Sequence, residues 1–156
     1  MAKKKKMGGK AIANILIAIL LILSIVMLFV PNVVFDLGIT SQSYSGAKIA
    51  FGYKEEVLGS KVQVLDFSFM AFLAYLLPVV GLLLSLLFKR AGSILSLILA
   101  VVILVGGIFA FIMPNFVIAT VTGEAVEGGS LGVGAIILGI ASILGALVVF
   151  GRKYLK

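Results

Sequence analysis

Four long stretches of this chain are almost entirely hydrophobic, and polar segments separate them. Each stretch has 20 residues without Asp, Glu, Lys or Arg; they are residues 11–30, 69–88, 94–113 and 131–150. A helix of 20 residues rises about 30 Å, which matches the hydrocarbon thickness of a bilayer. The pattern predicts an all-α membrane protein, a bundle of four transmembrane helices.

The segment 31–68 has a different pattern, in which apolar and polar residues alternate over 33–40, 48–54 and 61–64. A period of two is typical of β-strands, and the intervening 41–46 and 55–60 are rich in the Ser, Gly and charged residues of turns. We expect a small antiparallel β-sheet here, with one strand added from 116–122 in the second polar loop. Its apolar face would carry Val33, Phe35, Ile49, Phe51 and Val62, and would either bind a partner or lie on the helix ends or the second loop.

Charge fixes the expected orientation. Segments 1–10, 89–93 and 151–156 hold ten Lys and Arg, whereas 31–68 and 114–130 hold three Lys and all six Asp and Glu. Because Lys and Arg are retained in the cytoplasm, both termini and the 89–93 turn should be cytoplasmic, with both long loops outside. The net charge of +7 is thus distributed by side and does not indicate nucleic-acid binding.

We therefore expect one membrane domain over residues 1–156, in a multi-pass protein of the cell (cytoplasmic) membrane. Outside the four spans, it comprises a basic tail (1–10), a β-rich outer loop (31–68), a cytoplasmic turn (89–93), a second outer loop (114–130) and a tail (151–156). Lys outnumbers Arg by 11 to 2, as in AT-rich coding DNA, which favours a bacterial source.

Reactive groups are scarce in this sequence. Cys and His are absent, which removes disulfides, thiolate metal sites and the commonest acid–base group. The spans contain no carboxylate, and the spacing of the outer carboxylates matches no metal-ligand template. We expect no enzyme activity, no cofactor and no metal.

Small residues recur at helical spacing in the third and fourth spans. One stripe comprises Gly92, Ser96, Ala100 and Gly107, and the other comprises Gly132, Ala135, Gly139, Ser142 and Ala146. In lipid such stripes let helix backbones approach closely. They would serve either packing within the bundle or self-association.

Three residues within the spans have individual roles to explain. Asn14 would either donate an interhelical hydrogen bond or act as an interfacial cap, or else contact a pore or substrate. Tyr75 would be a packed ring whose hydroxyl finds a partner, and Pro78 should kink the second helix.

The arrangement resembles the claudins and related tetraspan proteins by topology. That resemblance implies cytoplasmic termini, a β-sheet in the first outer loop and a strand from the second. The claudin first-loop signature of Trp, Gly-Leu-Trp and two Cys is absent, because this chain has neither Trp nor Cys. Barrier function is therefore not implied.

These features predict an accessory, adhesion or scaffolding subunit that packs laterally with itself or another membrane protein and presents an outer sheet. Two alternatives stay open. One is a small oligomeric channel or transporter with Asn14 and serines along its path, and the other is immunity against a membrane-active toxin. The lipid bilayer is a partner in every case.

The absence of Cys makes the orientation directly testable. Single Cys replacements at Ser43 and Ala125 should react with a membrane-impermeant thiol reagent in intact cells, and one at Lys153 should react only after lysis. Labelling at Lys153 in intact cells would reverse the predicted threading.

Overall fold

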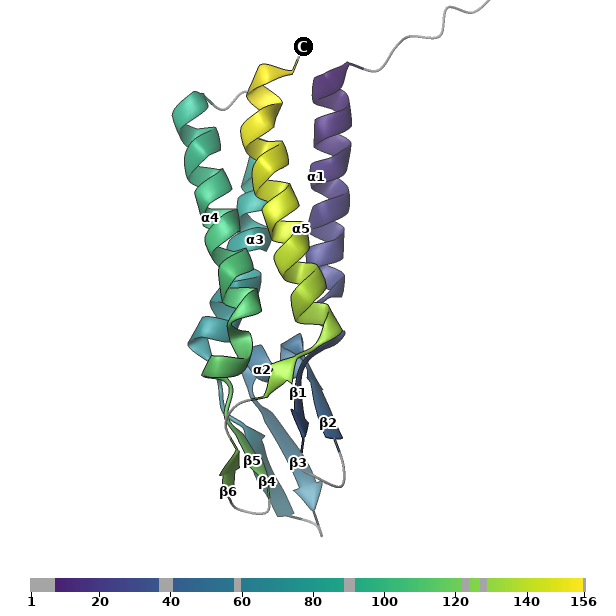
Figure 1. Ribbon diagram of the computed structural model, residues 1–156, viewed down its shortest axis with the longest axis vertical. Coiled ribbons are helices and arrows are strands. Elements are labelled where there is room, and N and C mark those ends of the chain that lie inside the picture. The colour runs from purple at the N-terminus through teal and green to yellow at the C-terminus, as the bar shows by residue number, and fades with distance from the viewer. Residues whose placement is uncertain are drawn as a thin grey trace, which may run out of the picture.

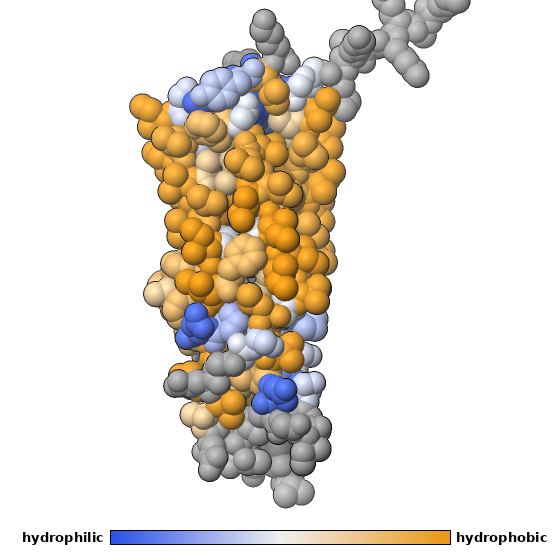
Figure 2. Space-filling model, viewed as in Figure 1, coloured by the Kyte–Doolittle hydropathy of each residue, from blue (hydrophilic) through white to orange (hydrophobic). Residues whose placement is uncertain are grey.

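Four long helices stand side by side in the computed structural model, which describes residues 8–36, 41–57, 60–88, 92–121, 124–126 and 129–155 (Figure 1). They are α1 (Gly9–Val26), α3 (Phe69–Leu87), α4 (Ser93–Phe111) and α5 (Val133–Gly151). Within the described residues, these four helices are long and apolar enough to cross a membrane. Apolar side chains cover most of the helical surface in view (Figure 2). The predicted bundle of four long apolar helices is confirmed, and the length and composition of the helices support a multi-pass membrane protein.

Three predicted helix boundaries differ by two or more residues at one end of the bundle; one of them is the end of α4, at Phe111 instead of 113, and the other two have a visible cause. α1 ends four residues before the predicted 30, and α5 begins two residues after the predicted 131. Asn32 explains the first difference, because its Nδ2 donates to the carbonyls of Met27 and Val30 beyond the helix. Pairing of Ser130 and Leu131 with Val34 and Val33 explains the second.

A β-layer caps this end of the bundle, which we call the sheet end; the opposite end, where α1 begins and α5 finishes, is the termini end (Figure 1). Its strands are β1 (Pro31–Asp36), β2 (Ser41–Ser45), β3 (Tyr53–Val57), β4 (Ser60–Leu65), β5 (Ala119–Val121), β6 (Glu124–Val126) and β7 (Ser130–Leu131). They form two sheets, ordered β2-β1-β7 and β3-β4-β5-β6, in which every pairing is antiparallel. Antiparallel pairing was expected, but in a single sheet with one strand from the second loop, whereas the structure has two sheets.

The predicted strand over 48–54 is wrong in its first half. Residues Gly46–Phe51 form a short helix, α2, and the predicted turns 41–46 and 55–60 contain parts of β2, β3 and β4. In α2 the buried residues are Gly46, Ile49 and Ala50. That i, i+3, i+4 spacing is helical, and over so short a segment it coincides with an alternating pattern. The predicted 37–40, 58–59 and 89–91 lie outside the described residues.

One hydrophobic core joins the β-layer to the helices. Val33 and Phe35 of β1, Ile49 of α2 and Leu65 of β4 pack in the same cluster as Ala71, Met113 and Leu138. A second cluster fills the bundle toward the termini end and includes Ile17, Leu82, Ile103 and Val149. The β-layer is therefore fixed on the helix ends by burial of its own apolar face.

Small residues set the contact between α4 and α5. A Cβ placed on Gly107 would lie 2.8 Å from Cβ of Ser142 and 3.3 Å from the carbonyl oxygen of Gly139. Of the remaining stripe residues, those buried are Ser96, Ala100, Gly132, Ala135 and Ala146. Gly92 is exposed and has open space around its Cα, so it lies outside this contact. The two stripes thus face inward, within the bundle.

Pro78 lies inside α3, which continues without interruption to Leu87. A Cβ on Gly106 of α4 would overlap the Pro78 ring, and one on Gly81 of α3 would lie 2.5 Å from Ile103. The proline is therefore seated in a notch that Gly106 leaves open, a packing feature that the sequence pattern did not single out.

Gly107→Leu should destabilise the bundle, because its side chain would enter the closed contact with Ser142. Overpacking of this kind costs about 1–3 kcal/mol, measurable as a lower thermal unfolding midpoint in detergent. Ile108→Leu is the matched control, because the neighbouring Ile108 is half exposed on the lipid-facing surface. Equal midpoints for the two variants would contradict the assigned contact.

Candidate functional site

Arg152 connects three helices at the termini end. It follows the last residue of α5 and is only 6% exposed. Its Nη1 donates to Oδ1 of Asn14 in α1 at 3.0 Å and to the carbonyl oxygen of Ser85 in α3 at 2.7 Å. Its Nη2 lies 3.5 Å from the carbonyl oxygen of Phe88, the C-cap of α3. One guanidinium therefore joins α1, α3 and α5.

The acceptors around Arg152 are uncharged. All six Asp and Glu of the sequence fall in segments 31–68 and 114–130, which connect the helices at the sheet end. The Asp and Glu residues that the structure describes therefore lie at the opposite end of the bundle from Arg152. Instead, the carbonyl end of α3 supplies the negative pole of the helix dipole, which favours a cation there.

Asn14 accepts a hydrogen bond from Arg152, just beyond α5, whereas it was expected to donate one. Arg152 was missed as a structural residue, because it was grouped with the basic tail. Its position, one residue beyond a span, was the available signal, since a long Arg stem can turn back toward helix ends. Ser85, also within a span, contributes its backbone carbonyl, and its hydroxyl has no partner among the described residues.

Tyr75 lies at the junction of the bundle and the β-layer. Its ring belongs to the shared core, and a Cβ on Gly46 of α2 would overlap its hydroxyl. The hydroxyl is buried and has no hydrogen-bond partner among the described residues. The expected partner for this group is therefore not found within that part of the chain.

The five residues expected to form an exposed apolar sheet face do not share one face. Val33, Phe35 and Ile49 are buried in the core, whereas Phe51 is 61% exposed and Val62 is 44% exposed. Ile49 and Phe51 lie in α2 rather than in a strand. The alternative that this face lies on the helix ends holds for Val33, Phe35 and Ile49, whereas the exposed Phe51 and Val62 do not belong to that face.

β2 has exposed polar residues and one buried residue, which packs against β1. Ser41, Gln42 and Ser43 are exposed, whereas Tyr44 is buried, with its ring edge-on to Phe35 at 6.0 Å between centroids. The Tyr44 hydroxyl donates to Oε1 of Gln42 at 2.6 Å. Burial raises the pKa of Tyr44, and nearby Glu55 raises it further, so the phenol stays neutral at physiological pH.

Within the described ranges, no group of three His, Cys, Asp or Glu side chains lies close enough together to hold a metal ion. Comparisons with protein family models, curated proteins and solved structures found no match to this chain.

Arg152→Leu should destabilise the packing of α1 against α3 and α5, because Asn14 and the Ser85 carbonyl lose their donor. Hydrogen bonds from a charged group contribute roughly 1.5–3 kcal/mol, so the unfolding midpoint in detergent should fall clearly. Lys153→Leu removes the same charge one residue later. Because the Lys153 Nζ only lies over the Phe150 and Tyr154 rings, the unfolding midpoint of this control variant should fall much less. The reverse order would refute the assigned role of Arg152.

Proposed function

We propose that this protein is a non-enzymatic accessory subunit of the cell membrane, with both termini in the cytoplasm and the β-layer outside. It binds a membrane-protein partner that adds an extended segment to the free edge of β2. The observation that carries the proposal is the contrast between this strand and the other edge strands of the layer.

β2 has the features of an edge open to strand addition. It lies at the end of the β2-β1-β7 sheet, where β1 is its one partner among the described strands, and its exposed residues are Ser41, Gln42 and Ser43. Natural edge strands are usually protected by charge, proline or very short length. β2 has five residues and neither charge nor proline. An extended peptide could therefore pair with it through backbone hydrogen bonds.

The other edges are protected. β3, at one end of the second sheet, exposes Lys54, Glu55 and Glu56. β6 has three residues, one of them Glu124, and β7 has only two. Protection of these edges limits nonspecific pairing and leaves β2 as the preferred site.

The shared core supports a binding role because it holds β2 in a fixed orientation. Tyr44 packs in the same cluster as Phe35, Met113 and Leu138, so the strand is anchored to the helices. A preorganised edge loses little conformational entropy on binding.

Lateral contacts in the bilayer would use α1 rather than the small-residue stripes, which are occupied by the α4–α5 contact. α1 presents an exposed apolar face that includes Ile15, Ile19 and Ile22. A partner helix or a second copy of the chain could pack there. The channel alternative gains no support, since Asn14 is bonded to Arg152, and nothing favours an immunity role.

Ser41→Lys/Ser43→Lys tests the edge without disturbing the core, because both side chains are exposed. Deleting the whole segment would instead remove the buried Tyr44, Ile49 and Ala50. The tagged wild-type protein should co-purify with a stoichiometric membrane protein in mild detergent. The double variant should lose that protein, because charge on an edge opposes pairing.

Glu56→Lys on β3 is the control, with a new positive charge on the protected edge, and it should retain the partner. Full retention by the Ser41→Lys/Ser43→Lys variant would refute binding at β2. Co-purification of the chain with itself alone would favour the oligomeric alternative.

A further inference from the structure

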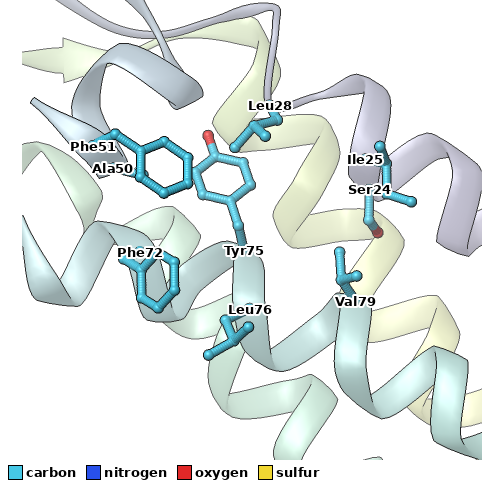
Figure 3. Close-up of a pocket in the computed structure, with 9 residues that line it drawn as sticks. All are labelled: Ser24, Ile25, Leu28, Ala50, Phe51, Phe72, Tyr75, Leu76 and Val79. Atoms are coloured by element: carbon cyan, nitrogen blue, oxygen red, sulfur yellow. The ribbon is translucent and has the colours of Figure 1, made fainter. Parts of the chain in front are cut away.

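An apolar cleft opens between α1 and α3 at the sheet end, under α2 (Figure 3). Its volume is about 180 Å³, room for roughly six groups of the size of a water molecule at ~30 Å³ each. α1 supplies Ser24 and Ile25, α2 supplies Ala50 and Phe51, and α3 supplies four further residues. The complete lining is Ser24, Ile25, Leu28, Ala50, Phe51, Phe72, Tyr75, Leu76 and Val79.

The cleft faces the outside of the bundle. Ile25, Phe51 and Leu76 on its rim are among the exposed large apolar residues, and α1 and α3 are both long and apolar enough to cross a membrane. At this position the surrounding medium is the lipid bilayer, whose acyl chains are apolar and narrow. A cleft of this lining and width therefore suits a hydrocarbon chain.

A buried hydroxyl in the wall indicates what else the ligand must carry. Tyr75 is only 6% exposed, and its hydroxyl has no partner among the described residues. Ser24, the other polar residue of the lining, already donates to the Leu20 carbonyl at 2.8 Å. An unsatisfied buried donor is costly, so Tyr75 calls for a ligand with an acceptor oxygen.

The depth of this hydroxyl matches a particular acceptor. Tyr75 lies six residues, about 9 Å, into α3, but helical side chains lean toward the N-terminus, here the sheet end. In Figure 3 the Phe51 ring lies beside the Tyr75 ring, and the Tyr75 hydroxyl is at the end where a Cβ on Gly46 of α2 would overlap it. Asp66, three residues before α3, marks where the polar region begins, since charge avoids the hydrocarbon. The hydroxyl thus lies near the level at which lipid acyl chains join their headgroups.

We propose that the cleft binds one acyl chain of a diester phospholipid from the leaflet on the sheet side. The ester carbonyl of that chain accepts a hydrogen bond from Tyr75. The hydroxyl is buried against Gly46 of α2 and is not exposed to the cleft, so binding requires a shift of the side chains that cover it. This site is independent of the β2 edge, and its test does not require a protein partner.

Diester and diether phospholipids with the same headgroup and chain length test the hydrogen bond, because the diether lacks the carbonyl. Equal amounts of the two are offered to the full-length chain in detergent, and bound lipid is counted by native mass spectrometry. Wild type should prefer the diester roughly two- to tenfold, the effect of one hydrogen bond. Tyr75→Phe should lose this preference, and Tyr44→Phe in β2 should keep it.

A larger side chain in the cleft lining tests whether lipid occupies the cleft. Val79→Phe should reduce bound lipid at least tenfold, and Ile140→Phe, on the exposed face of α5, should leave it unchanged. Thermal midpoints show whether each variant is folded, and if Val79→Phe is not, the diester comparison alone decides. Equal retention of the two lipids by wild type, or a protein side chain cross-linked in the cleft at Leu76, would overturn the proposal.

Discussion

Burial of the β-layer on the helix ends is the interaction on which the rest of this structure depends. The strands are only two to six residues long, and both sheets contribute side chains to the cluster that they share with the helices. Phe35, Ile49 and Leu65 are buried only because they reach the same cluster as Met113 and Leu138 of the helical part. Layer and bundle must therefore fold as one unit, because separation would expose both sides of that cluster.

Backbone proximity reinforces this junction where α5 begins. The Gly132 N–H donates to the Asn32 carbonyl at 2.8 Å, and a Cβ on Gly132 would lie 2.6 Å from the Pro31 carbonyl oxygen. At the other end, Arg152 joins α1 to α3 and α5. α1 is thus held at both ends, while much of its length faces outward. Its two attachments explain how a helix with few buried residues, Ala13, Ile17 and Ser24, keeps its place.

The long helices were predictable because hydropathy over 20 residues depends on the bilayer thickness and hardly on tertiary contacts. The helix at residues 46–51 was not predictable, because six residues are too few to distinguish the period of 2 of a strand from the period of 3.6 of a helix. The close contact of Gly46 with Tyr75 favours the helix. The two small-residue stripes, one with Gly107 and the other with Ser142, could be proposed from their spacing. The helix that each stripe packs against could not. Arg152 could not be distinguished from its basic neighbours, because its partners are 64 to 138 residues away in sequence.

The consecutive elements β2, α2 and β3 connect the two proposed binding sites, the edge of β2 and the apolar cleft. The Ala47 N–H donates to the Leu28 carbonyl at 2.7 Å, which fastens α2 to the chain just beyond α1. α2 also supplies Ala50 and Phe51 to the cleft and carries Gly46 against the Tyr75 hydroxyl. A lipid that shifted Phe51 would act on a helix continuous with β2, the edge proposed for a partner. Because Tyr44 and Ile49 anchor both elements in one core, such a shift stays local unless that core also yields.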